Sequence, residues 1–178
     1  LSYPIAALTD ETGEVLSVWG DWVKNAEYLK VDYSDIRAKL LDEIGDVCWN
    51  LAELATLLDV PLEYINKYAE SNHVNVATTI SYYMCQLSTA VGRVNGTWAK
   101  YIRKHDGVQP TVAEVQKEAL EGDKTFRSVM TGNCILVFHA INNLITRLEF
   151  DRNEVLSHNI EKLAQRKKTN TLGGKGSV

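Results

Sequence analysis

The chain has 178 residues, of which 45% are hydrophobic and 24% charged, and its formal net charge is -4. This composition provides enough apolar residues for a sizeable core. The acidic balance, with a pI near 5.6, argues against nucleic acid as a partner, because nucleic-acid-binding proteins usually present a basic surface. We expect a soluble, cytoplasmic protein without membrane contact, since we see neither a long uninterrupted apolar run nor a basic leader followed by an apolar stretch.

The three cysteines, Cys48, Cys85 and Cys134, are far apart in the sequence and lie in apolar runs. An odd number of widely separated cysteines is not the pattern of a disulfide framework. We therefore expect three buried free thiols.

Apolar residues recur every three or four positions in the first part of the chain, which is the pattern of amphipathic helices. The first predicted helix covers residues 4–24. The second covers residues 36–58 and carries a broad apolar stripe. Pro61 then begins a short third helix, because proline is favoured in the first turn.

The helical pattern resumes after Asn72. A long helix is predicted over residues 76–105, and Asp106 with Gly107 ends it. Three more helices follow, a short one over residues 111–121, a long one over residues 126–148 and a last one over residues 151–168. The predicted fold class is all-α, a helical bundle.

Two parts of the chain resemble each other, which indicates an internal duplication. A shift of 79 residues matches the first helix to the fourth, pairing Ser2 with Ser81, Tyr3 with Tyr82, Gly13 with Gly92 and Trp19 with Trp98. A shift of 90 residues pairs Val47, Leu54, Thr56 and Leu58 with Val137, Leu144, Thr146 and Leu148. The short helix at 111–121 accounts for the difference between the shifts. We predict two degenerate tandem copies, residues 1–73 and 74–178, in one intertwined globular unit.

Four acidic residues form two pairs, Glu11 with Glu14 and Glu43 with Asp46, each spaced i, i+3 on a predicted helix. This spacing places both carboxylates of a pair on one side of the helix. Glycines inside the pairs, Gly13 and Gly45, would let the helices approach closely. Converging carboxylates about 5 Å apart repel by roughly 3 kcal/mol per pair at an effective dielectric of 20, so the cluster needs a cation. Oxygen ligands alone favour Mg²⁺, with Mn²⁺ as a substitute. The alternative is that these are solvated surface acids.

The segments Glu11-Thr-Gly-Glu14 and Glu43-Ile-Gly-Asp46 are separated by 28 residues. They resemble the E-x-x-E, spacer, E-x-x-D signature of the MazG-like all-α nucleoside triphosphate pyrophosphohydrolases. Near the other end, Asn159, Lys162 and Arg166 resemble the N-x-x-K-x-x-x-R element of that family, and residues 173–176 resemble its glycine-containing tail.

The resemblance implies Mg²⁺-dependent hydrolysis of a nucleoside triphosphate, usually a deoxynucleotide, to the monophosphate and pyrophosphate. It implies that the four acids hold the metal and that Glu11 or Glu14 orients or deprotonates the attacking water. The candidate substrate-binding residues are Asn50, Lys24, Asn159, Lys162, Arg166, Trp22 and Trp49. Of these, Lys162, Arg166 and, more weakly, Lys24 would meet phosphates, and Trp22 or Trp49 would stack on the base. The alternatives are that Lys162 and Arg166 form a solvated basic turn that complements the helix dipole, and that the tryptophans belong to the core.

The second copy has lost the acids, because Ala90 and Arg93 take the places of Glu11 and Glu14, and Asn133 and Leu136 those of Glu43 and Asp46. Conversely, the first copy has Ser71 and Asn75 where the second has Lys162 and Arg166. We therefore expect a fused dimer with one site that spans both copies.

The compact, duplicated chain resembles bacteriophage enzymes that adjust the dNTP pool. We expect its substrate to be a purine nucleotide such as dGTP. Homo-oligomerisation is expected, because relatives build bundles from identical chains. Two alternatives stay open, a non-catalytic nucleotide-binding helical module and a pyrophosphohydrolase of another phosphate ester such as phosphoribosyl-ATP.

Overall fold

The computed structural model describes residues 1–29, 33–69, 79–122 and 124–169. Within these residues the chain forms seven α-helices and no strand, which confirms the all-α class. The helices are α1 (Ser2–Leu29), α2 (Tyr33–Leu57), α3 (Leu62–Ala69), α4 (Ile80–Lys104), α5 (Val112–Gln116), α6 (Phe126–Arg147) and α7 (Arg152–Lys168).

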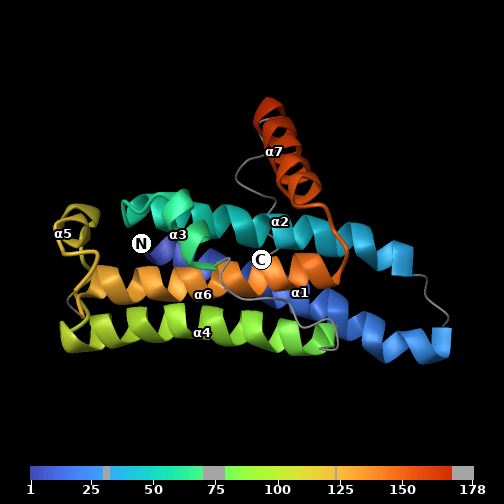
Figure 1. Cartoon of the computed structure of the whole chain (residues 1–178), viewed down its shortest axis with the longest axis horizontal. Coiled ribbons are helices and arrows are strands. Elements are labelled where there is room, and N and C mark those ends of the chain that lie inside the picture. The colour runs from blue at the N-terminus through green and yellow to red at the C-terminus, as the bar shows by residue number, and fades with distance from the viewer. Residues whose placement is uncertain (30–32, 70–78, 123, 170–178) are drawn as a thin grey trace.

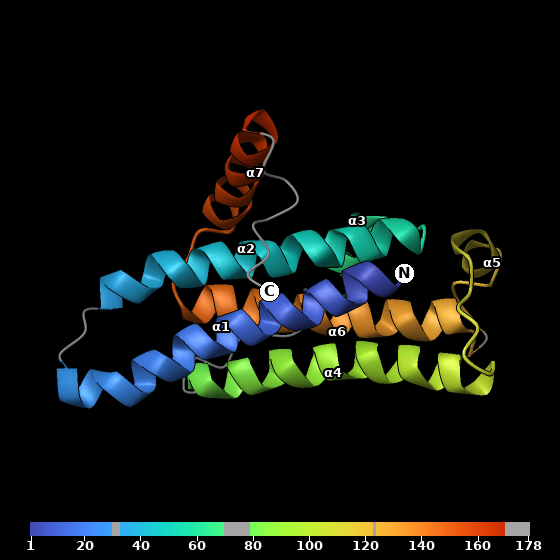
Figure 2. The same ribbon diagram turned by 180° about the vertical axis from the view of Figure 1, so that it is seen from behind.

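The four long helices α1, α2, α4 and α6 lie side by side and form an elongated bundle (Figures 1 and 2). Helix α1 packs on α2, α4 packs on α6, and the two pairs meet through α1 with α4 and α2 with α6. Hydrogen bonds from Asn95 to Thr9 and from Trp19 to Ser81 show that α1 and α4 run antiparallel. Chain connectivity therefore alternates direction around the bundle.

Helices α3 and α7 each pack on the helix pair that they do not follow in the sequence. Helix α3 follows α2 in sequence but packs on α6, whereas α7 follows α6 but packs on α2. Helix α7 stands out from the bundle in both views (Figures 1 and 2). Each helix pair thus carries the short helix that belongs, in sequence, to the other pair.

The core is a continuous set of aliphatic side chains contributed by all the long helices. The largest side chains that are completely buried are Ile5, Leu8, Leu40, Ile44, Leu51, Leu54, Leu58, Ile65, Leu87, Met130, Ile141 and Leu144. Their spacing of three or four residues along each helix is the reason these segments are helical, since only a helix turns all of them to one side. Within the described residues, α6 is apolar and long enough to cross a membrane, but 61% of its most apolar window is buried, as in the core helix of a soluble protein.

Two turns, one after α2 and one after α6, have the same geometry. Asp59 has a φ of 53° and Glu149 a φ of 58°, which is uncommon for residues other than glycine. The backbone N–H of Val60 donates to the carbonyl of Ala55, and that of Phe150 donates to the carbonyl of Ile145. Both helices therefore end with a residue in the left-handed conformation and with the same pattern of backbone hydrogen bonding. The two turns lie 90 residues apart in the sequence.

An arginine from the neighbouring helix pair contacts each of these turns. The buried Arg127 of α6 donates from Nε to the carbonyl of Leu58 at 2.8 Å and from Nη2 to that of Asp59 at 2.7 Å. On the other side, the guanidinium of Arg37 in α2 lies 4.6 Å from the centre of the Phe150 ring. These two contacts join the α1–α2 and α4–α6 pairs at both turns.

Some sequence predictions need correction. The short helix α5 covers only Val112–Gln116, because the Thr111 capping box begins it and the chain turns away soon after. Cys134 is buried and Cys48 partly buried, but Cys85 is exposed, so the expectation of three buried thiols is wrong for Cys85. Ser71, Asn75 and the glycine tail at 173–176 lie outside the described residues.

Candidate functional site

The two acidic pairs face each other across the contact between α1 and α2. Carboxylate oxygens of Glu11, Glu14 and Glu43 all lie within 4.8 Å of one another. A second group, Asp42, Glu43 and Asp46, meets the same limit. Glu43 belongs to both groups, so the acids form one continuous cluster that begins on α1 and ends on α2.

The cluster raises the pKa of two of its members. Partial burial raises the pKa of Glu43 from 4.5 to about 7, and its hydrogen bond and charge repulsion with Glu14 add to the effect. Burial likewise raises the pKa of Glu11 to about 7, with repulsion from Asp46 and Glu14 as the next causes. Both shifts arise from burial of a carboxyl group among other carboxyl groups, so a positive charge at this place would favour the ionised forms.

Helix α7 brings two donors to the α2 side of the cluster. Asn159 donates from Nδ2 to Asp46 Oδ1 at 2.5 Å. Lys162 donates from Nζ to Asp46 Oδ2 and to Asp42 Oδ1, each at 2.6 Å. Burial opposes the charged ammonium, but the bonds to Asp42 and Asp46 outweigh it and raise the pKa of Lys162. Both carboxylate oxygens of Asp46 thus have partners from α7.

Gly45 allows this contact. A Cβ at position 45 would lie 3.0 Å from the Cβ of Asn159, so any larger residue would push α7 away. Gly13 is different, because a Cβ there would meet nothing within 4 Å. The prediction that both glycines serve close helix approach is therefore wrong for Gly13, and the helix that approaches Gly45 is α7 and not α1.

Asp42 and His158 are members of the site that the sequence interpretation missed. Asp42 accepts the second bond from Lys162, and its Oδ1 lies 3.3 Å from Nε2 of His158. Asp42 directly precedes the E-x-x-D motif and lies one turn before Asp46. That spacing was the signal available in the sequence. For His158, only the packing of α7 on α2 shows the contact.

Hollows flank the acids on both sides along α1. One, of about 580 Å³, is lined by Tyr3, Asp10, Glu11 and neighbouring small residues of the first turns. The other, of about 200 Å³, lies farther along α1 and is lined by Val18, Asp21, Trp22, Asn25, Ile36 and Lys39. Trp22, a predicted base-stacking residue, is therefore placed in a hollow beyond the acids, where its ring packs on Trp19 with centroids 4.9 Å apart.

The other predicted substrate-binding residues differ in their placement. Asn50 is buried, and its Nδ2 donates to the carbonyl of Asp46 at 3.0 Å. Trp49, on the turn after Asp46, is 50% exposed. Arg166 is exposed on α7, one turn beyond Lys162, in the basic end of the helix. Lys24 is exposed on α1 and lies ten residues past Glu14, roughly 15 Å along the helix axis, so the fold does not bring it to the acids.

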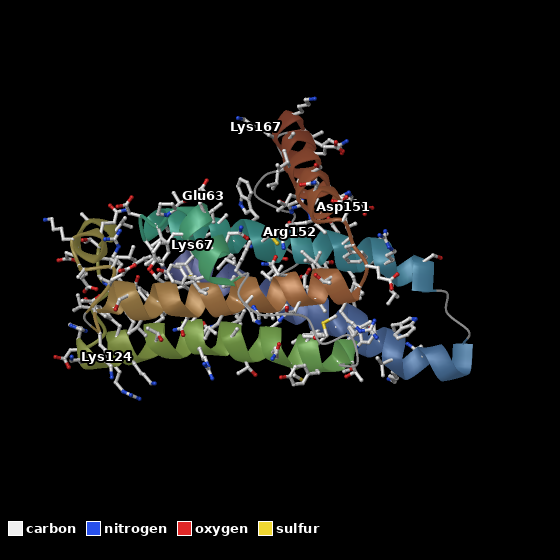
Figure 3. The ribbon with its side chains drawn as sticks, in the orientation of Figure 1. Glu63, Lys67, Lys124, Asp151, Arg152 and Lys167 are labelled. Carbon is white, nitrogen blue, oxygen red and sulfur yellow. The ribbon has the colours of Figure 1, made fainter. Side chains whose placement is uncertain are left out.

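The last turn of α7 is basic and follows Lys162, the residue that contacts the acids. Asp151 begins the helix by accepting hydrogen bonds from the backbone N–H groups of Asn153 and Glu154. Figure 3 shows Asp151 and Arg152 at the base of α7 and Lys167 near its far end. Acids on α1 and α2 therefore lie next to a helix whose last turn is rich in lysine and arginine.

The donor set fits a hard divalent cation. Ionised carboxylate oxygens are the ligands that Mg²⁺ and Mn²⁺ prefer, and those of Glu11, Glu14 and Glu43 lie within 4.8 Å of one another. Glu11, Glu14 and Glu43 would hold the ion, and Asp46 would join them only if its bonds to α7 rearranged. No family model, curated protein or solved structure matches the chain.

Proposed function

We propose that this protein is a Mg²⁺-dependent pyrophosphohydrolase of the MazG-like all-α type, which converts a (deoxy)nucleoside triphosphate to the monophosphate and pyrophosphate. The observation that carries the proposal is the cluster of Glu11, Glu14 and Glu43 beside the ammonium of Lys162. Negative ligands for a metal and a positive group for phosphates lie side by side, as a metal-bound triphosphate requires. A purine such as dGTP is the preferred candidate substrate, and the cytoplasm is the expected compartment.

The residues of the cluster have distinct roles in this proposal. When bound, Mg²⁺ neutralises phosphate charge and lowers the pKa of a water molecule, which supplies the nucleophile. Glu11 or Glu14 orients that water or accepts its proton, because a carboxylate within reach of the water can act as a general base. The hollows on either side of the acids provide room for the nucleoside, with Trp22 as a stacking surface in one of them.

Helix α7 supplies the groups for phosphate in this proposal. Lys162 already lies on Asp46, and Arg166 follows one turn later, where a guanidinium can bind phosphate oxygens in bidentate fashion. Substrate would compete with Asp42 and Asp46 for the Lys162 ammonium. Release of Asp46 and capture of phosphate by Lys162 would then occur together.

The proposed duplication is supported by the reciprocal packing. The turns at Asp59 and Glu149 share a rare backbone conformation at the shift of 90 residues found in the sequence. The same shift relates Arg127 to Arg37, and each contacts the turn of the other pair. Helices α3 and α7 are exchanged in the same way. This arrangement is what a fused dimer with one remaining site would have, with acids from residues 1–73 and the basic helix from residues 74–178.

Pyrophosphate release from a panel of nucleoside triphosphates and phosphoribosyl-ATP, each with Mg²⁺ and with chelator, tests the proposal. We expect release from at least one triphosphate, in Mg²⁺ only. Release from phosphoribosyl-ATP alone would favour the other phosphate ester. Tight nucleotide binding without release from any compound would indicate the non-catalytic module, and release that persists in chelator would contradict the metal role.

A further inference from the structure

A hollow of about 290 Å³ lies between α4 and α6, away from the acids on α1 and α2. Ala90 and Arg93 of α4 and Leu136 and Ala140 of α6 line it, together with Tyr82 and Gln86 from the first turns of α4. The proposed function assigns no role to this hollow.

Its position corresponds to that of the acidic cluster in the other helix pair. The shift of 79 residues relates Tyr82 to Tyr3 and Ala90 to Glu11. Tyr3 and Glu11 line the hollow beside the acids in the same way. The second pair has therefore kept a hollow at this place on the bundle while the charge of its wall has changed.

The charge at the hollow is the reverse of the charge at the acids. Among the described residues that line it, no carboxylate is present, and Arg93 stands where α1 has Glu14. No carboxylate of the described residues forms a salt bridge with the Arg93 guanidinium. Mg²⁺ therefore has no carboxylate ligand among the described lining residues, whereas an anion has a guanidinium to bind.

The remaining lining groups suit the organic part of a ligand. Ala90, Leu136 and Ala140 form an apolar floor, and the Tyr82 ring is 51% exposed. Gln86 donates from Nε2 to the Tyr82 hydroxyl at 2.8 Å, but its Oε1 is buried without a hydrogen-bond partner. A ligand N–H would satisfy that acceptor, since a buried unpaired polar atom is costly.

We propose that this hollow binds a nucleoside monophosphate without a divalent ion, with the phosphate on Arg93 and the base against Tyr82 and the apolar floor. A single guanidinium offsets roughly half of the charge of about −1.5 to −2 on a monophosphate, whereas a triphosphate carries more charge and needs a Mg²⁺ ion, for which the described lining residues offer no carboxylate. The volume is at the small end for ligand pockets, which suits a compact ligand. The choice of a nucleotide as the ligand rests on the proposed function, because a nucleoside monophosphate would be its product. The existence of the hollow and its positive charge do not depend on that function.

Calorimetric titration of the whole chain with dGMP in excess chelator tests this inference. Chelator prevents the proposed reaction, and the Glu43→Gln variant, which lacks an acid of the cluster, should bind dGMP as the wild type does. Arg93→Gln should weaken binding at least tenfold, because a charge-assisted bond to phosphate is lost. Arg103→Gln, an exposed arginine of the same helix that does not line the hollow, should leave the affinity unchanged.

Two further arms make the result decisive. Thr89→Trp fills the hollow from an exposed helical position and should abolish dGMP binding. This variant tests the inference independently in case Arg93→Gln folds poorly. Inorganic phosphate and deoxyguanosine, tested alone, should each bind at least tenfold more weakly than dGMP. Absence of dGMP binding, equal binding by Arg93→Gln, or equal affinity for phosphate alone would overturn the inference. Because these measurements do not depend on turnover, they can fail while pyrophosphate release succeeds, or the reverse.

Discussion

Replacing Glu43 with glutamine should stabilise the metal-free protein above neutral pH and leave its stability unchanged in acid. Glutamine has the shape of the protonated glutamic acid but carries no charge at any pH. The folded protein raises the pKa of Glu43 from 4.5 to about 7, with burial first and the Glu14 carboxyl second among the causes. Glu43 therefore favours folding below pH 4.5, and this contribution is lost as the pH rises through about 7.

The magnitude follows from the same numbers. At 1.36 kcal/mol per pKa unit, the displacement of the Glu43 pKa would correspond to about 3 kcal/mol for a group shielded from water. Glu43 is only partly buried, so solvent screening reduces the expected effect to about 1 kcal/mol. In a chain of this length that free energy corresponds to a rise in Tm of about 2–4 °C.

Urea denaturation in chelator at pH 4 and pH 8 measures the effect. We expect Glu43→Gln to raise the free energy of unfolding at pH 8 by about 1 kcal/mol and to match the wild type at pH 4. Glu161→Gln, an exposed acid of α7 outside the cluster, controls for the change in net charge and should show no comparable gain. Equal stability of wild type and Glu43→Gln at pH 8 would refute the reasoning that burial and the neighbouring carboxylates disfavour the charged form of Glu43.

Three further predictions concern the α7 contact and the metal. Gly45→Ala should lower the free energy of unfolding by about 1–2 kcal/mol because its Cβ meets Asn159. The matched Gly13→Ala, in open space, should raise it by about 0.5–1 kcal/mol. Equal effects would contradict the close approach of α7. Lys162→Met should cost about 2 kcal/mol in chelator, since two carboxylates lose their donor, and an unchanged urea midpoint would speak against these bonds. Calorimetry should show triphosphate binding at least about tenfold tighter in Mg²⁺ than in chelator, and equal affinities would exclude a shared metal site.

Helix positions could be predicted from the sequence because apolar periodicity is a local property. The acids of α1 and α2 could be paired in advance for a related reason, since a short connection makes consecutive helices antiparallel neighbours. The carboxylate oxygens of Glu14 and Glu43 meet as this argument requires.

The parts that could not be predicted depend on packing between distant segments. Asp42 carries the same charge as its neighbours, and the hydrogen bond that it accepts from Lys162 is what distinguishes it from a solvated acid. The different environments of Gly13 and Gly45 likewise depend on which helix covers each position, which the spacing of the glycines does not reveal. Lys24 lies on the same helix as Glu11 and Glu14, but the rise of about 1.5 Å per residue of a helix puts it too far along α1 to reach them.

The central claim is that the acids of α1 and α2 form the site of a metal-dependent pyrophosphohydrolase. Phosphorus NMR of dGTP incubated with the protein in Mg²⁺ tests it most directly, with wild type and Glu43→Gln compared at equal concentration. We predict dGMP and pyrophosphate from the wild type, and a rate at least about a hundredfold lower from Glu43→Gln, because the loss of a metal ligand costs several kcal/mol of transition-state stabilisation. Formation of dGDP and inorganic phosphate, or equal rates from the two proteins, would contradict the account.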